Sequence, residues 1–239
     1  MFNIAVKELR SIFLFPLAWT ILGVVQVVIA FVFAATVEEF LQLNLHISLT
    51  DFVFVSTFMI VAFILLFVAP LITMRLFSEE RRNKTLPLLL SSPVSLTSIV
   101  LGKYLGSLSF FVILIALLML MPLSLLFGAI LDFGQIASGL LGIFLLVGAF
   151  TAIGLYISAL TAHPTVAAIG SYGILLLLLI IHWVGGVEEQ NTLFNYLSMI
   201  RHYYALLRGL FDTEHVIYYL LIIVTFLTLT IRHLDNERI

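Results

Sequence analysis

Few residues in this sequence are spaced as a catalytic or metal site would require. The six histidines lie at positions 46, 163, 182, 202, 215 and 233 without an H-x-x-x-H pair, and the chain has no cysteine. Ser171 lies in Gly170-Ser-Tyr-Gly173, where close helix packing explains the glycines better than a nucleophile without a base. Gly102-Lys103 lacks the upstream glycine of a P-loop. We therefore expect no catalytic residue, cofactor or metal site in this chain.

One stretch, residues 77–95, instead combines charge with a cluster of leucines, which is the chemistry of protein binding. Its candidate contact residues are the charged Glu79, Glu80, Arg81 and Arg82, then Thr85, Leu86, Leu88, Leu89 and Leu90. Thr85 can cap a short helix, and Pro87 suits its first turn. An apolar cluster between charged flanks favours a groove on another protein. A helix lying flat on the inner leaflet is the alternative.

Long apolar helices must position this stretch, because 62% of the residues are hydrophobic and the mean hydropathy is +1.22. A helix needs about 20 apolar residues to cross a bilayer. Six runs meet this requirement and predict an all-α, polytopic integral membrane protein with a single transmembrane domain, residues 1–239. The six predicted spans cover residues 17–37, 52–77, 104–128, 136–160, 165–184 and 215–232.

The basic residues predict the orientation of these spans. With both termini in the cytoplasm, only Arg201 and Arg208 of the eleven Lys and Arg residues lie on the outer side. Cytoplasmic loops collect Lys and Arg. We therefore expect both termini and the 77–95 stretch to lie in the cytoplasm.

Local patterns predict three further features of the helices. Residues 3–15 place Lys7 and Arg10 opposite apolar residues, which is typical of a helix lying in the membrane interface. The alternative is that they form the end of the first span. Pro70 predicts a kink in the second span, because it removes a backbone donor. Small residues in the fourth span predict close helix packing; they are Ser138, Gly142, Ala149, Ala152 and Ala159.

The segment before the last span predicts an outer amphipathic or re-entrant helix over residues 193–211. Tyr204 belongs to its apolar stripe, while Arg201 and Arg208 share another face. We expect these two arginines at the headgroup level, near an exit for cargo or a seat for an outer partner. The alternative is purely structural ion pairing with the nearby acids Glu188, Glu189, Asp212 and Glu214.

The interiors of the predicted spans contain almost no ionisable group. Ion-coupled carriers and pumps need such groups within the membrane. Any energy used by this protein should therefore come from a partner ATPase on the cytoplasmic side.

Two motifs resemble those of ABC-2 type exporter permeases. In that family, a helix leaves the second span with E-x-x-x-G-T, continues into a short apolar coupling helix, and ends at a Ser/Pro turn before Gly-Lys. Here Glu80–Thr85 reads E-R-R-N-K-T, with Lys84 where the family often has glycine, and Gly102-Lys103 follows. The C-terminal part, with Ile200-Arg-His-Tyr203 and Arg208–Asp212, is similar to permeases related to gliding-motility exporter subunits. Copper-processing exporters share this plan.

The resemblance implies the permease subunit of an ATP-driven exporter in a bacterial or archaeal cytoplasmic (inner) membrane. It implies pairing with a second permease, identical or homologous, and docking of two ATP-binding cassette ATPase subunits at residues 79–93. ATP and Mg²⁺ would then bind to those partners. Membrane lipids are expected partners, an extracytoplasmic auxiliary subunit is an open option, and nucleic acid is not expected. The alternatives are a membrane scaffold for an extracytoplasmic assembly and an ion-coupled secondary carrier.

Overall fold

The computed structural model describes the chain except residues 44–47, 92, 128–130, 186–195 and 238–239, and side chains are also omitted at 43, 127 and 181–185. The described residues form only helices and their connections, which confirms the all-α prediction. In chain order they are α1 (Phe2–Leu14), α2 (Pro16–Leu43), the π-helix η1 (Thr50–Phe54), α3 (Val55–Thr73), α4 (Ser78–Arg82), α5 (Leu86–Leu90), α6 (Leu96–Ser124), the 3-10 turn η2 (Leu125–Phe127), α7 (Phe133–Leu160), α8 (Pro164–Gly185), α10 (Met199–Leu207) and α11 (Thr213–Asn236).

Five stretches of the described chain are long and apolar enough to cross a membrane. Four of them are the helices α2, α6, α7 and α11, and the fifth covers residues 50–82 and contains α3. This supports the predicted multi-pass membrane protein. The fifth predicted span, residues 165–184, corresponds to α8, whose fully described part, Pro164–Ile180, is apolar but shorter than these five. The number of six spans therefore stays a prediction.

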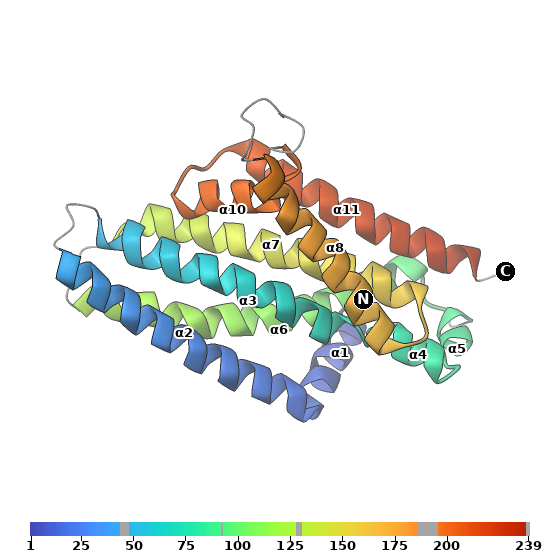
Figure 1. Cartoon of the computed structure of the whole chain (residues 1–239). Coiled ribbons are helices and arrows are strands. Elements are labelled where there is room, and N and C mark those ends of the chain that lie inside the picture. Colours follow the sequence, from blue (N-terminus) through green and yellow to red (C-terminus); the bar gives the residue numbers. More distant parts are fainter. Residues whose placement is uncertain (44–47, 92, 128–130, 186–195, 238–239) are drawn as a thin grey trace.

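The long helices form one bundle with two distinct ends. Helices α2, α3, α6 and α7 run side by side, α8 crosses over α3 and α7, and α11 packs along α7 (Figure 1). One end carries α1, α4, α5 and the C-terminal end of α11, and we call it the basic end. The opposite end carries α10, η1 and the start of α11.

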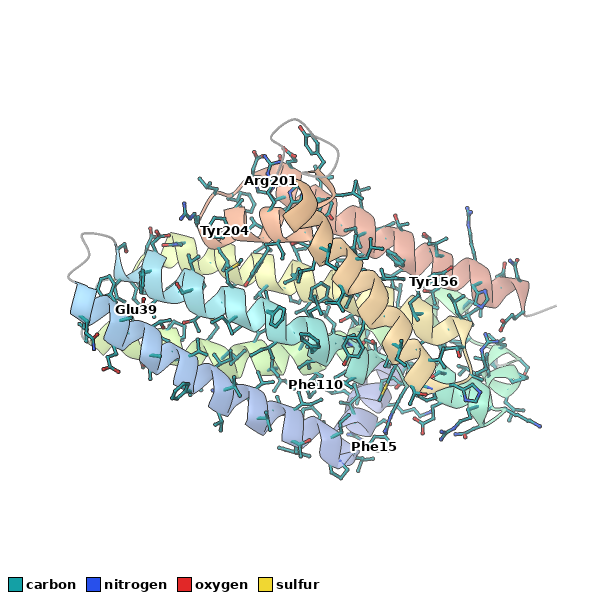
Figure 2. All side chains as sticks on the ribbon, in the orientation of Figure 1. Phe15, Glu39, Phe110, Tyr156, Arg201 and Tyr204 are labelled. Carbon is teal, nitrogen blue, oxygen red and sulfur yellow. The ribbon has the colours of Figure 1, made fainter. Side chains whose placement is uncertain are left out.

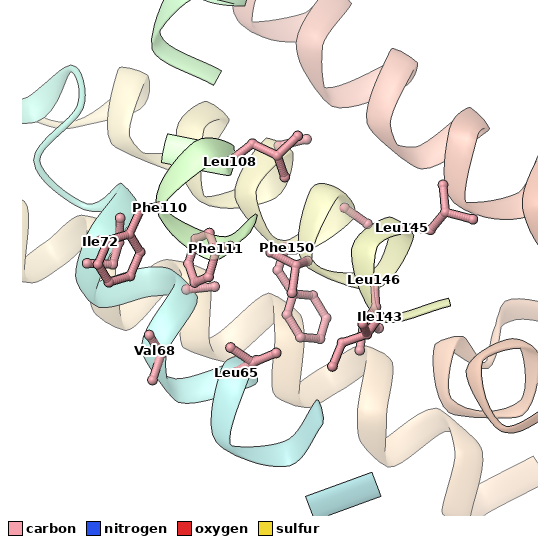
Figure 3. Packing of buried hydrophobic residues seen from close by; sticks show 14 of the residues in the cluster. Leu65, Val68, Ile72, Leu108, Phe110, Phe111, Ile143, Leu145, Leu146 and Phe150 are labelled. Atoms are coloured by element: carbon pink, nitrogen blue, oxygen red, sulfur yellow. The ribbon is translucent and has the colours of Figure 1, made fainter. Parts of the chain in front are cut away.

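Helix α7 lies at the centre of the bundle because its small residues allow neighbours to approach closely. The five small residues predicted to pack are all buried. Gly154 shows the requirement most clearly, since a Cβ built there would clash with Oγ1 of Thr73 on α3. Around α7, large side chains fill the space, including Leu65 of α3 and Phe111 of α6 (Figure 3). The prediction of close packing in this helix is confirmed.

Several helix boundaries differ from the predicted spans. The chain breaks between α1 and α2 at Phe15, and α2 begins with Pro16. Pro70 lies within the last turn of α3, which ends three residues later at Thr73. The kink at Pro70 stays a prediction. Helix α6 begins at Leu96, where the Ser95 hydroxyl accepts a hydrogen bond from the amide of Ser98. Lys103 is therefore inside a helix rather than in the loop before it.

Candidate docking site at the α4–α5 segment

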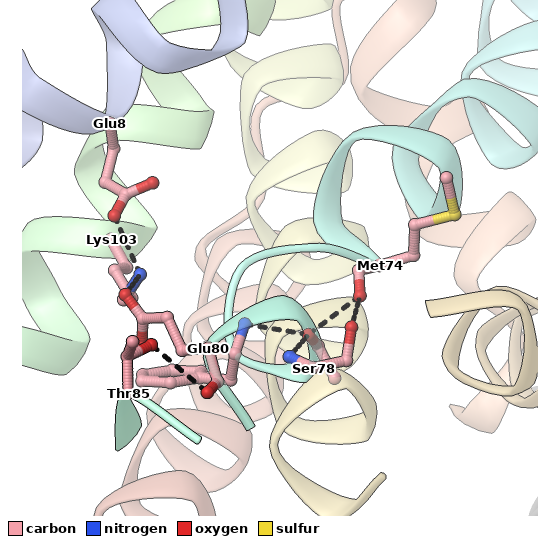
Figure 4. Close-up of polar contacts among 8 residues, drawn as sticks. Glu8, Met74, Ser78, Glu80, Thr85 and Lys103 are labelled. Carbon is pink, nitrogen blue, oxygen red and sulfur yellow. Dashed lines mark hydrogen bonds and ion pairs between the residues drawn. The ribbon is translucent and has the colours of Figure 1, made fainter. Parts of the chain in front are cut away.

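The turn from α3 into α4 is fixed by one serine of α7. The hydroxyl of Ser158 accepts hydrogen bonds from the amides of Phe77 and Ser78, at 3.0 and 3.1 Å. It donates to the carbonyl oxygen of Met74 at 3.0 Å (Figure 4). Ser158, Phe77 and Ser78 are buried. The start of the α4–α5 segment, which we define as residues 78–90, is thus held against the centre of the bundle.

On one side of the segment, Glu80 contacts Lys103 of α6. The Lys103 Nζ lies 2.8 Å from Glu80 Oε1 and 2.7 Å from Oε1 of Glu8 on α1 (Figure 4). It also lies 5.1 Å from the centre of the Phe77 ring. Lys103 is only 2% exposed. Our sequence reading missed this cluster, although the Gly-Lys motif at the start of the helix and an acid on α1 were both visible.

On the other side, Arg81 joins the segment to α7 and α11. Its Nη2 donates to the carbonyl oxygen of Ala159 at 2.7 Å and lies 2.8 Å from both carboxylate oxygens of Glu237. Neighbouring residues of α4 therefore contact opposite sides of the basic end. Arg82 is exposed, and Glu79 is half-buried beside Glu8 in a shallow pocket between α1 and the end of α3.

The turn between α4 and α5 depends on a residue in an unusual backbone conformation. Lys84 has a φ of 58°, in the left-handed region that favours glycine. The hydroxyl of Thr85 donates to the carbonyl oxygen of Glu80 at 3.2 Å. Thr85 occupies the N-cap position of α5 but makes no side-chain cap bond. The predicted capping role is therefore wrong, because this hydroxyl closes the preceding turn instead.

Helix α5 exposes fewer leucines than its sequence suggests. Leu86 and Leu90 are buried against the bundle, and Leu89 is half-buried. Leu88 is 72% exposed. An open groove of 640 Å³ lies between α5 and the end of α11, with Pro87 and Glu237 among its lining residues. The apolar surface available to a partner therefore centres on Leu88 rather than on four leucines.

The predicted interfacial helix is present as α1. Lys7 and Arg10 are exposed, while Ala5 is buried against α6. Phe15, at the junction with α2, packs under the guanidinium of Arg75 at 4.9 Å. This amphipathic arrangement agrees with a position in the membrane interface, which stays a prediction.

The predicted outer helix is shorter than expected, and it buries a different face from the one predicted. Helix α10 ends at Leu207, so Arg208 lies at its C-cap rather than on a shared face with Arg201. The buried residues are Met199, His202, Tyr203, Leu206 and Leu207. Tyr204 is exposed under the guanidinium of Arg208, and Arg201 is exposed as well (Figure 2). The predicted stripe fails because His202 and Tyr203, which have polar groups, form part of the buried face. Residue 193 lies outside the described residues.

Two histidines and three tyrosines hold α10 in place. Nδ1 of His202 lies 2.7 Å from Nδ1 of His215 on α11, and its Nε2 lies 3.1 Å from the Tyr196 carbonyl oxygen. Burial lowers the pKa of His202. The hydroxyls of Tyr203, Tyr218 and Tyr219 each donate to a backbone carbonyl oxygen. Among the described residues, no three His, Asp or Glu side chains gather as a metal site would require.

The fold is that of a polytopic helical membrane protein in which a short, well-anchored helical segment, α4–α5, connects the long helices α3 and α6. The chain belongs to the ABC-2 family of transporter proteins, whose family model matches residues 2–237. It is therefore the membrane permease subunit of an ABC transporter, a transport subunit that is not itself catalytic. The resemblance in the sequence motifs is confirmed. No curated protein matches the chain.

Proposed function

We propose that this permease belongs to an ATP-driven exporter and that its α4–α5 segment docks an ATPase subunit. The observation that carries the proposal is Leu88, an exposed leucine on a short helix whose neighbours Leu86 and Leu90 are buried. The flanking residues Arg82 and Lys84 are exposed and charged. This combination offers an apolar anchor within a polar rim, which is the usual composition of a protein interface.

The anchoring of the segment supports a role in transmitting force. Glu80 and Arg81 join it directly to α6, α7 and α11, Lys103 links it further to α1, and Ser158 fixes its first turn. A partner that pushes on Leu88 would therefore displace the bundle rather than a loose loop. Two permeases, identical or homologous, would pair so that two ATPase subunits dock on two such segments, with ATP and Mg²⁺ bound in the ATPases.

Docking at this segment fixes the orientation, because ATP is available in the cytoplasm. The basic end would then face the cytoplasm of a bacterial or archaeal cell, in agreement with the positive-inside rule. The exposed Arg201, Tyr204 and Arg208 would lie at the outer surface, where they would shape the exit for cargo or the seat of an auxiliary subunit.

Leu88→Asp tests the docking site. A charge placed at an anchor leucine loses its hydration when the interface forms, so we expect ATPase subunits to bind at least about tenfold more weakly. The measurement is co-purification of ATP-binding cassette subunits with the full chain, together with the ATP hydrolysis of the complex. The matched control is Leu210→Asp, since Leu210 is 63% exposed at the opposite end. Unchanged binding by Leu88→Asp would show that docking occurs elsewhere, and hydrolysis independent of this chain would favour a scaffold.

A further inference from the structure

Lys103 is the point at which three separate elements of the basic end meet. It projects from the second turn of α6 and contacts Glu8 of α1 and Glu80 of α4, within 2.8 Å of each carboxylate. These residues are far apart in the sequence, and no contact between the two carboxylates is described. The ammonium group is therefore the bridge between the interfacial helix and the α4–α5 segment.

The burial of this bridge separates it from an ordinary surface ion pair. The side chain of Lys103 is 3% exposed, and those of Glu8 and Glu80 are 15% and 25% exposed. Buried charges are weakly screened by salt, and removing one partner leaves the other without compensation. A lysine with three donors can satisfy two carboxylates at once. The bridge is thus built to hold both acids together.

Two glycines of α6 allow α1 to pack closely enough for Glu8 to reach Lys103. A Cβ built at Gly102 would lie 2.8 Å from Cβ of Ile4, and one built at Gly106 would lie 2.7 Å from Cβ of Glu8. The two glycines flank Lys103 and bring α1 against α6 at the height of its ammonium group. This packing of α1 against α6 does not depend on the ion pairs, and it places Glu8 within reach of the Lys103 ammonium group.

Helix α1 packs along α6 and lies at the edge of the bundle. Ala5 is its only buried residue, and the single residue Phe15, in an extended conformation, separates it from α2. The first half of α2 is also largely exposed, with Trp19 and Val24 both more than half exposed. A small movement of α1 would therefore involve its contacts with α6 and α2, while the buried centre around α7 stays in place.

We propose that Lys103 is a positioning residue that makes α1 follow the α4–α5 segment when the ATPase moves that segment. Glu80 receives the displacement, Lys103 transfers it, and Glu8 passes it to α1 and, through Phe15, to the start of α2. This inference rests on the proposed docking function. It adds a route to the interfacial helix that is separate from the contacts of Arg81 with α7 and α11.

The test uses the full permease–ATPase complex in lipid nanodiscs and one bimane-labelled cysteine at a time. Arg10→Cys reports on α1 and Arg82→Cys reports on α4; both sites are exposed, and the chain has no other cysteine. Emission is compared without nucleotide and with ATP and vanadate. We expect both reporters to respond in the unmodified complex. In Glu8→Gln, Glu80→Gln and Lys103→Met, the Arg82 reporter should still respond while the Arg10 reporter loses its response.

The matched control is Asp235→Asn, because Asp235 is an exposed acid of α11 at the same end and forms no ion pair among the described residues. Both reporters should respond in this variant. A purely structural role for Lys103 would lower stability without separating the two responses. Equal responses at Arg10 in all variants, or none in the unmodified complex when Arg82 responds, would overturn the proposal.

A second measurement tests the bridge in the full chain without ATPase. Glu8→Gln or Glu80→Gln alone leaves Lys103 one carboxylate, whereas the double variant leaves none. We expect the double variant to lower the thermal midpoint by more than the sum of the single losses. This excess should disappear in a Lys103→Met background, and additive losses would overturn the bridge. If no ATPase subunit bound the chain at all, the docking proposal would fail, and this cycle would still decide whether Lys103 links α1 to α4.

Discussion

The two ends of the bundle are held together by different chemistry. At the basic end, charged side chains join the elements, with Lys103 between Glu8 and Glu80 and Arg81 bound to Glu237. At the opposite end, neutral tyrosine hydroxyls donate to backbone carbonyls: Tyr203 to Phe58 at 2.9 Å and Tyr219 to Met199 at 2.7 Å.

This difference indicates which end can rearrange. The ion pair between Arg81 and Glu237 is partly exposed on both sides and can exchange for water, whereas the buried Lys103 bridge lets α1 and α4 move together. Tyr203 and Tyr219 are fully buried, so breaking their hydrogen bonds would leave polar groups unsatisfied. We therefore expect movement at the basic end and a fixed layer at the opposite end.

Helices α3 and α7 pack against each other and connect the two ends of the bundle. Disrupting their contact should therefore destabilise both ends together and remove the contrast between a movable and a fixed end. In Gly154→Ala, the new methyl group would overlap Oγ1 of Thr73, which itself donates to Ala69. We expect the free energy of unfolding to fall by about 3 kcal/mol, at the upper end of the range for overpacking. Reversible unfolding in detergent or bicelles measures this loss.

The control for this substitution is Gly173→Ala on α8. A Cβ at Gly173 meets nothing within 4 Å, so alanine should be neutral or stabilise the helix by up to about 1 kcal/mol. Similar losses in both variants would mean that the close approach at Gly154 is not what limits the packing of α3 against α7.

A smaller effect should be confined to the basic end. Lys84 has a left-handed backbone conformation, which is unfavourable for a residue with a Cβ. Lys84→Gly should therefore stabilise the turn by up to about 1 kcal/mol, partly offset by the greater freedom of glycine when unfolded. The control is Asn83→Gly, because Asn83 has a φ of −82° and gains nothing from glycine. Protection of α4 and α5 amides from hydrogen exchange would report the change, and a loss of protection in Lys84→Gly would contradict it.

The sequence predicted features that depend on neighbours along the chain. The long apolar runs and the amphipathic pattern of α1 were both visible from composition and spacing. In each case the controlling interaction is local or follows from the requirement for apolar length.

What the sequence did not reveal depends on partners distant along the chain. Glu8 and Lys103 are 95 residues apart, and no periodicity indicates that they meet. The burial of Leu86 and Leu90 depends on how α5 lies against other helices, so an apolar run alone could not separate them from Leu88. The buried face of α10 was mispredicted because Tyr203 is buried through its hydrogen bond to α3.

The histidine pair gives the opposite end a dependence on pH. Nε2 of His202 faces the Tyr196 carbonyl oxygen and must carry a hydrogen, so its Nδ1 accepts from His215. Burial is the main reason that the pKa of His202 is lowered, and the positive charges of His215 and Arg201 act in the same direction. The Tyr196 carbonyl and Glu214 oppose this shift. The neutral form of His202 is therefore the one that the fold stabilises.

The sign of the resulting pH effect follows from proton uptake. Above the ordinary imidazole pKa of about 6.5, His202 is neutral in both folded and unfolded chains, so the contribution to stability is complete. As the pH falls below about 6.5, the unfolded chain binds a proton that the folded chain resists, and stability decreases down to the lowered pKa. Hydrogen exchange of α10 between pH 8 and pH 5 should show this loss, and His202→Gln should remove it. His163→Gln, at an exposed site near the basic end, should leave the loss unchanged. If α10 were equally protected at both pH values in the unmodified chain, the neutral tyrosine bonds alone would account for the stability of the opposite end.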